Sequence, residues 1–227
     1  MTKGCFPATI TLFMIMLMSC GTNQGPADKP AADTVAKQPA ASANEEKTIV
    51  FFGNSLTAGY GVEPGQAFPA IIQHYIDSLD LPYKVVNAGV SGETSSGGNS
   101  RVDWILKQPL DIFVLELGAN DGLRGVSPSE TRKNLQSIID KVKAKYPAAR
   151  IVIAGMMLPP NMGQQYTNEF RSIFPELAKT NNATLIPFLL EGVGWEARFN
   201  QQDGIHPTPE GHEILARNVW KVMKDML

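Results

Sequence analysis

Short apolar runs alternate along the chain with longer stretches in which apolar residues recur every three or four positions. Five runs rich in Val, Ile, Leu and Phe predict β-strands, at residues 48–52, 84–88, 111–117, 150–156 and 184–188. Because these runs are almost continuously apolar, we expect strands that are buried on both faces, as in a parallel sheet.

Two stretches between and after these runs predict amphipathic helices. One begins at Ser127, where Pro128 suits the first helical position and Glu130 would complete a capping box. Its apolar face holds Leu135, Ile138, Ile139 and Val142. The other follows Thr208 and Pro209, and its inward face holds Ile214, Leu215, Val219, Trp220 and Met223. Strands that alternate with helices predict a three-layer α/β/α sandwich of about five parallel strands.

The first 47 residues lack this alternation. Lys3 precedes an apolar stretch, residues 6–18, that is too short to span a bilayer and is typical of a signal peptide. The stretch ends in Leu-Met-Ser-Cys, which resembles a bacterial lipoprotein signal with acylation at Cys20. The alternative is an ordinary secretory signal followed by a chance cysteine. We favour the lipoprotein signal because the small residue and the cysteine directly follow the apolar stretch.

This interpretation divides the chain into three parts: a signal peptide at 1–19, a disordered tether at 20–47 and one folded domain at 48–227. The tether is rich in Ala, Pro, Asn, Gln and Lys and has no apolar periodicity. The expected location is the bacterial cell envelope, at a periplasmic or outer-membrane face, with membrane contact through the lipid alone. Nothing in the sequence requires more than a monomer.

Charge and cysteine content exclude several functions. The formal net charge of −2 gives no basic field for nucleic acid. Cys5 would leave with the signal and Cys20 would carry lipid, so the domain has neither a disulfide nor a thiol nucleophile. Only three histidines are present, without carboxylates at ligand spacing, so we expect no metal and no other cofactor.

Two distant segments carry residues suited to nucleophilic catalysis. Ser55 directly follows the first predicted strand, while Asp203 and His206 lie in a Gly- and Pro-containing loop near the C-terminus. A serine becomes nucleophilic when a base takes its proton and a third group orients that base. Alternatively, Ser55 only caps a helix. Thr57 rules out the G-x-S-x-G elbow of the α/β-hydrolases.

Two further segments follow predicted strand ends, Asn-Ala-Gly-Val-Ser-Gly-Glu around Gly92 and Gly-Ala-Asn-Asp-Gly around Asn120. Each could be a plain turn. A backbone N–H at Gly92 and the side-chain amide of Asn120 would also suit stabilisation of an oxyanion. The carboxyl ends of parallel strands meet at one edge of a sheet, so we expect these segments to converge near Ser55.

The four segments together resemble the signature blocks of the SGNH, or GDSL-type, hydrolases, which have a flavodoxin-like sandwich. The resemblance implies catalytic residues Ser55, Asp203 and His206, and an oxyanion hole formed by Ser55, Gly92 and Asn120. Residues 115–125 are similar to the branch that contains acyl-CoA thioesterase I, lysophospholipases and arylesterases. That branch usually has Asp before the serine, whereas this chain has Asn54.

The resemblance implies a serine esterase that hydrolyses small or lipid-like acyl esters or thioesters through an acyl-enzyme. Residues 156–160, which include Met157, Leu158 and Pro159, and residues 188–190 are apolar enough to line an acyl groove, although Met157 and Leu158 could equally pack the core. Two alternatives stay open, a polysaccharide O-deacetylase of the same fold and a catalytically silent surface-binding module.

Overall fold

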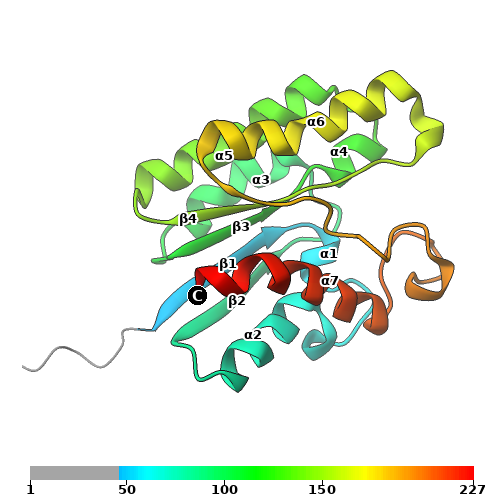
Figure 1. The fold of residues 1–227 in the computed structure, drawn as a ribbon. Helices are drawn as coiled ribbons and strands as arrows, with labels where there is room; N and C mark the ends of the chain where they lie inside the picture. Colours follow the sequence, from blue (N-terminus) through cyan, green and yellow to red (C-terminus); the bar gives the residue numbers. More distant parts are fainter. Residues whose placement is uncertain (1–45) are drawn as a thin grey trace, which may run out of the picture. The chain divides into compact units, whose positions relative to one another are not determined.

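The computed structural model describes residues 46–227, and the predicted signal peptide and Cys20 lie outside that range (Figure 1). Five parallel strands form one sheet in the order β2-β1-β3-β4-β5. The strands are β1 (Lys47–Gly53), β2 (Tyr83–Gly89), β3 (Ile112–Glu116), β4 (Arg150–Ala154) and β5 (Thr184–Ile186). This order is that of a flavodoxin-like sheet, so the predicted α/β class and strand number are confirmed.

Helices cover both faces of the sheet (Figure 1). Helices α2 (Phe68–Ser78) and α7 (Pro209–Met223) pack together on one face. Helices α3 (Ser95–Ile105), α5 (Pro128–Lys145) and α6 (Gln164–Asn181) pack on the other. Among residues 46–227, no helix has the length and apolar character needed to cross a bilayer.

Shorter helices complete the connections between these elements. Two are single α-helical turns that directly follow strands, α1 (Ser55–Ala58) after β1 and α4 (Ala119–Leu123) after β3. The remaining helices are 3₁₀ turns at Pro64–Gln66, Pro160–Met162, Ala197–Phe199 and Lys224–Met226. Because α1 and α4 begin at adjacent strand ends, both start at the same edge of the sheet.

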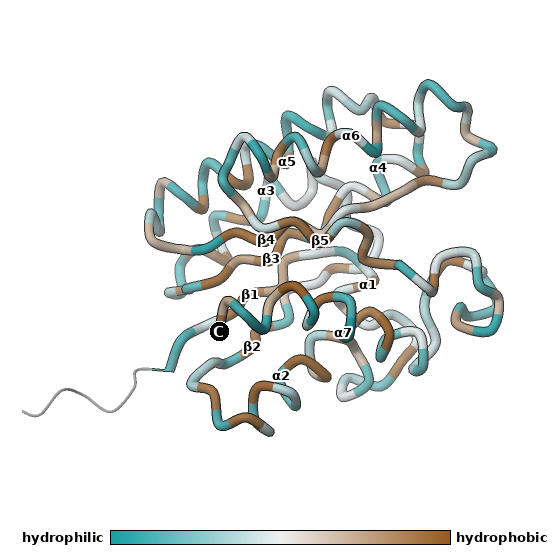
Figure 2. The backbone as a smooth tube through the Cα atoms, in the orientation of Figure 1, coloured by the Kyte–Doolittle hydropathy of each residue, from teal (hydrophilic) through white to brown (hydrophobic). Residues whose placement is uncertain are grey.

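The core lies between the sheet and the two helical layers, where the hydrophobic segments of Figure 2 gather. Phe51, Phe52 and Phe113 are fully buried on the central strands β1 and β3. The expectation that every strand is buried on both faces is wrong for β2. This strand forms the edge of the sheet, and Val86 in it is 37% exposed.

The two predicted helices form at their expected positions. The apolar face of α5 is buried throughout, whereas Ile214 and Trp220 of α7 are only partly buried. The predicted capping box of α5 is absent, because the Ser127 hydroxyl pairs with that of Ser129 at 2.6 Å instead of capping the helix. In α7 the Thr208 hydroxyl does accept from the Gly211 amide.

Candidate active site

Ser55 lies at the turn between β1 and α1, with its side chain directed toward a cavity at the carboxyl edge of the sheet. The side-chain oxygen of Asn54 accepts the Leu56 amide at 2.9 Å and thereby caps α1. Ser55 is only 7% exposed, and its Oγ lies 2.9 Å from Nε2 of His206. The structure therefore joins the two residues that the sequence separates by 151 positions.

His206 is held in a short antiparallel turn. Asn200 and Pro207 form a β-bridge, and the Gln201 amide donates to the His206 carbonyl at 2.7 Å. Gly204 takes a φ of +76° at the tip, a conformation that glycine adopts without steric penalty. The turn consequently brings Asp203 and His206 side by side.

Both oxygens of the Asp203 carboxylate are engaged. Oδ1 accepts the backbone amides of Ile205 and His206, each at 3.0 Å, and Oδ2 lies 2.6 Å from Nδ1 of His206. The hydrogen bonds from His206 and Ile205 lower the pKa of Asp203 to about 2. An ionised carboxylate only accepts, so Nδ1 must donate, which leaves Nε2 free to accept the Ser55 proton.

A second set of contacts ties this turn to the segment after Ser55. Nε2 of Gln201 donates to the carbonyls of Tyr60 and Pro207, at 2.7 and 3.0 Å. The Tyr60 ring packs on the His206 ring with centroids 4.5 Å apart. These contacts connect the turn that carries His206 to the segment that follows Ser55.

Asn120 and Gly92 lie on two neighbouring loops of the same edge. Asn120 is in α4, lines the cavity with Ser55, and donates one amide hydrogen to the Glu93 carbonyl at 2.9 Å. Gly92 precedes Glu93 with a φ of +78° and lies outside the lining of the cavity. Within residues 46–227 the backbone amides of Ser55 and Gly92 donate to no protein group. The two backbone amides and the second side-chain amide hydrogen of Asn120 are therefore without a protein acceptor in the described part of the chain, and Ser55 and Asn120 both line the cavity.

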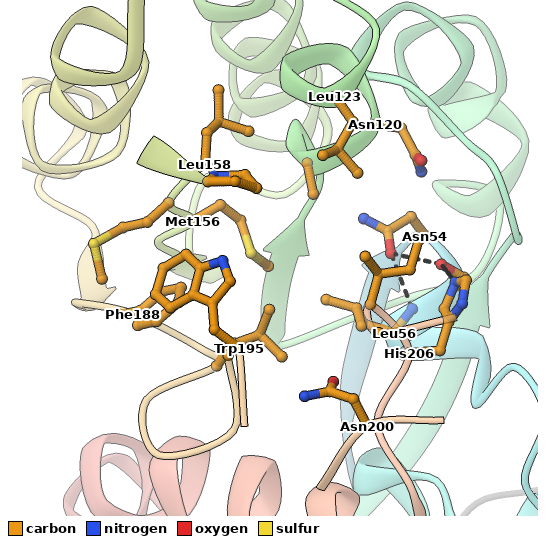
Figure 3. A pocket seen from close by; sticks show the side chains of 18 residues that line it. Asn54, Leu56, Asn120, Leu123, Met156, Leu158, Phe188, Trp195, Asn200 and His206 are labelled. Carbon is orange, nitrogen blue, oxygen red and sulfur yellow. Dashed lines mark hydrogen bonds between the residues drawn. The ribbon is translucent and has the colours of Figure 1, made fainter. Parts of the chain in front are cut away.

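The cavity has a volume of about 240 Å³, and most of its lining is apolar (Figure 3). Met157, Leu158 and Pro159 lie in its lining together with Met156 and Phe188, and Leu158 also packs in the core. The sequence did not identify four other apolar side chains of the lining, which are Leu56, Leu123, Trp195 and Ile205. Figure 3 shows Trp195 and Phe188 on the side opposite Asn54 and His206.

A buried carboxyl group that the sequence did not reveal lies beneath the nucleophile. Glu116, the last residue of β3, is fully buried and accepts from the Thr57 hydroxyl at 2.8 Å and the Asn54 side-chain amide at 2.7 Å. Gly53 makes room for it, because a Cβ there would lie 2.5 Å from the Glu116 carboxylate. The available signal was an acidic residue at the end of a continuously apolar run.

This arrangement explains how Asn54 fits in place of the usual Asp. Its backbone and side-chain amides both donate to Glu116, at 3.0 and 2.7 Å. A carboxylate at position 54 would instead face the Glu116 carboxylate at hydrogen-bond distance, and the pair would have to share a proton. Asn54 therefore donates hydrogen bonds to the buried Glu116 side chain, and the two residues do not have to share a proton.

Burial shifts the pKa values of two side chains in opposite directions. Burial raises the pKa of Glu116 to about 7, although hydrogen bonds from Thr57 and Asn54 oppose the shift. Burial, aided by the charge of His206, lowers the pKa of His212 in α7 to about 4. The Phe68 amide donates to Nδ1 of His212, and within the described part of the chain Nε2 of His212 has no partner.

These pKa values predict compensating effects on stability. A raised acid pKa stabilises the fold below pH 4.5, and that stabilisation is lost as pH rises toward 7. A lowered histidine pKa stabilises the fold above pH 6.5, and that stabilisation is lost as pH falls toward 4. The two contributions therefore oppose each other between these limits in the wild type.

Single substitutions should separate the two contributions. Urea unfolding at a series of pH values measures the free energy of unfolding. In Glu116→Gln only His212 contributes, so this free energy should rise from pH 4 to 6.5. His212→Asn, which keeps an acceptor for the Phe68 amide, should lose stability from pH 4.5 to 7. Wild-type pH slopes in both variants would contradict this assignment.

Among residues 46–227 no cluster of three or more His, Cys, Asp or Glu side chains could hold a metal ion. The polar groups around Ser55 bind one another or face the cavity. Their arrangement can polarise a hydroxyl and accommodate a negatively charged oxygen.

Comparison with known proteins places this geometry in context. The model described as the GDSL-like Lipase/Acylhydrolase family matches residues 51–214. "Esterase TesA" of Pseudomonas aeruginosa is 37% identical over 182 residues, which is 80% of this chain and 90% of that protein. "Thioesterase 1/protease 1/lysophospholipase L1" of Escherichia coli K12 is 39% identical over 170 residues, 74% of this chain and 79% of that protein.

A solved structure is also similar. The crystal structure of TesA superposes with a TM-score of 0.76 at 37% sequence identity, covering 80% of this chain and all of that one. The similarity therefore extends over four-fifths of this chain.

Proposed function

Because the chain belongs to the GDSL-like lipase/acylhydrolase family and is a carboxylic ester hydrolase, we propose that it acts through a Ser55-His206-Asp203 triad and an acyl-enzyme. The observation that carries this proposal is a continuous set of hydrogen bonds. Ser55 Oγ lies 2.9 Å from Nε2 of His206, and Nδ1 lies 2.6 Å from Asp203. Each residue is therefore within reach of the proton that it must move or orient.

In the acylation step, Ser55 Oγ attacks the substrate carbonyl carbon while Nε2 of His206 takes the hydroxyl proton. The bond to the leaving oxygen or sulfur then breaks, and His206 returns the proton to the departing alcohol or thiol. Asp203 keeps Nδ1 protonated and stabilises the imidazolium that forms.

The negative oxygen of the tetrahedral intermediate needs hydrogen-bond donors. We assign this role to the backbone amides of Ser55 and Gly92 and to the Asn120 side chain. Asn120 already donates to the Glu93 carbonyl, so its second amide hydrogen is available for the oxyanion. Water then attacks the acyl carbon while His206 takes one of its protons. The bond to Ser55 Oγ breaks, His206 returns the proton to Oγ, and the carboxylic acid is released.

The apolar lining supports an aliphatic or aryl acyl substrate. Leu56, Met156 and Phe188 offer no polar group to a sugar hydroxyl, so the lining favours acyl esters over acetylated polysaccharide. At about 240 Å³, the cavity lies below the usual range for drug-sized ligands, which favours a short acyl group.

Purified protein should be tested on p-nitrophenyl butyrate, a lysophospholipid, an acyl-CoA and an acetylated sugar. We expect clear turnover of the aryl ester, and stoichiometric labelling of Ser55 by a fluorophosphonate. Preference for the acetylated sugar would favour the deacetylase alternative. No turnover and no labelling would favour a silent binding module and overturn the proposal.

The lipid anchor at Cys20 and the envelope location concern residues outside the described range. They stay predictions from the sequence. The catalytic proposal does not depend on them, because all its residues lie within 46–227.

A further inference from the structure

A second hollow adjoins the cavity beside Ser55. Its volume is about 490 Å³, and it runs toward α6, where Thr167, Asn168 and Arg171 line its far end. The two hollows have three lining residues in common, Met157, Leu158 and Trp195. These side chains therefore form the wall between the small cavity beside Ser55 and a larger hollow next to α6.

Trp195 is the unusual member of this wall. It is 57% exposed, and its indole stacks on Phe188 with centroids 5.8 Å apart (Figure 3). Its backbone has a φ of +65°, which a bulky residue seldom adopts, and it directly follows Gly194. Such strain persists where the surrounding structure imposes it, and it concentrates at binding sites and clamps.

The indole is also the part of the wall that is not packed in the core. Leu158 is buried among core side chains, whereas Trp195 lies on an exposed loop directly after Gly194. A rotation or truncation of Trp195 would open the wall without disturbing the core. The same change at Leu158 would leave an empty space in the core.

We propose that Trp195 is a chain-length gate, which closes the cavity behind a short acyl group and excludes longer chains from the second hollow. This proposal rests on the proposed function, because the excluded group is the acyl chain of the ester. The substrates of the wild type are then short acyl esters. With the gate open, a longer chain passes Met157 and Leu158 toward α6.

The test compares kcat/KM for p-nitrophenyl butyrate and p-nitrophenyl dodecanoate. Trp195→Ala should raise the dodecanoate-to-butyrate ratio by about tenfold or more, in line with the usual effect of added methylenes in an apolar pocket. Trp195→Phe, which keeps a smaller ring, should give an intermediate ratio. The matched control is Trp104→Ala, on α3 away from both hollows and 68% exposed, which should leave the ratio unchanged.

A double variant tests whether the longer chain uses the second hollow. Asn168→Trp in the Trp195→Ala background should fill that space and return the ratio to the wild-type value. An unchanged ratio in Trp195→Ala, or a gain that survives Asn168→Trp, would overturn the gate. Absence of butyrate turnover in the wild type would overturn the proposed function itself, so the two failures are distinguishable.

Discussion

Replacing Ser55 by alanine should lower kcat/KM for p-nitrophenyl butyrate by about 10⁵ to 10⁶-fold. The hydroxyl at 2.9 Å from His206 is the nucleophile in the proposed mechanism, so its removal abolishes the acyl-enzyme route. The residual rate would come from the oxyanion donors and from substrate binding alone. Steady-state kinetics and fluorophosphonate labelling would both report the loss.

The Ser55→Ala result requires evidence that the fold is intact. Ser55 contributes one hydroxyl in a nearly closed pocket, so the urea midpoint should change little. Ser100→Ala, on the exposed side of α3, is the matched control and should retain full activity. Undiminished ester hydrolysis in Ser55→Ala would exclude Ser55 as the nucleophile.

Replacing Asn120 by alanine should lower kcat by about 10² to 10³-fold while KM changes little. The amide stabilises charge that develops only after attack, so its effect belongs to the transition state. The change also removes the hydrogen bond to the Glu93 carbonyl, and a destabilised loop would raise KM as well.

A control variant at a second asparagine separates the catalytic effect of Asn120→Ala from its structural effect. Asn181 in α6 also donates its side-chain amide to a backbone carbonyl, that of Leu177 at 3.0 Å, but it lies outside the cavity lining. Asn181→Ala should lower the urea midpoint and leave kcat unchanged. If Asn120→Ala behaves in the same way, its role is structural and the oxyanion assignment is wrong.

Much of the site could be predicted because parallel strands bring their carboxyl ends to one edge. Ser55, Gly92 and Asn120 each follow a strand, so periodicity alone placed them on a common edge. Asp203 and His206 are only three residues apart, and a Gly-containing turn was enough to suggest that they meet.

Other features depend on contacts that periodicity does not encode. The exposure of β2 follows from its edge position, which strand order determines. Ser127 caps nothing because a neighbouring hydroxyl competes for it. Glu116 looked like the polar end of a strand, although Gly53 and Thr57 enclose it completely. Trp195 lies in a loop without periodicity, so its place in the cavity depends on tertiary packing.

The bond between Ser55 and His206 joins residues at opposite ends of the folded domain. Ser55 follows β1, the first strand of the domain, and His206 lies three residues before the last long helix, α7. Ordering so long a loop has an entropic cost, which the sheet and both helical layers must offset. A nascent chain that ends before Asp203 therefore contains the proposed nucleophile but neither the proposed base nor the acid that orients it. We expect hydrolytic activity only after the turn that carries Asp203 and His206 has been synthesised and has folded against Ser55.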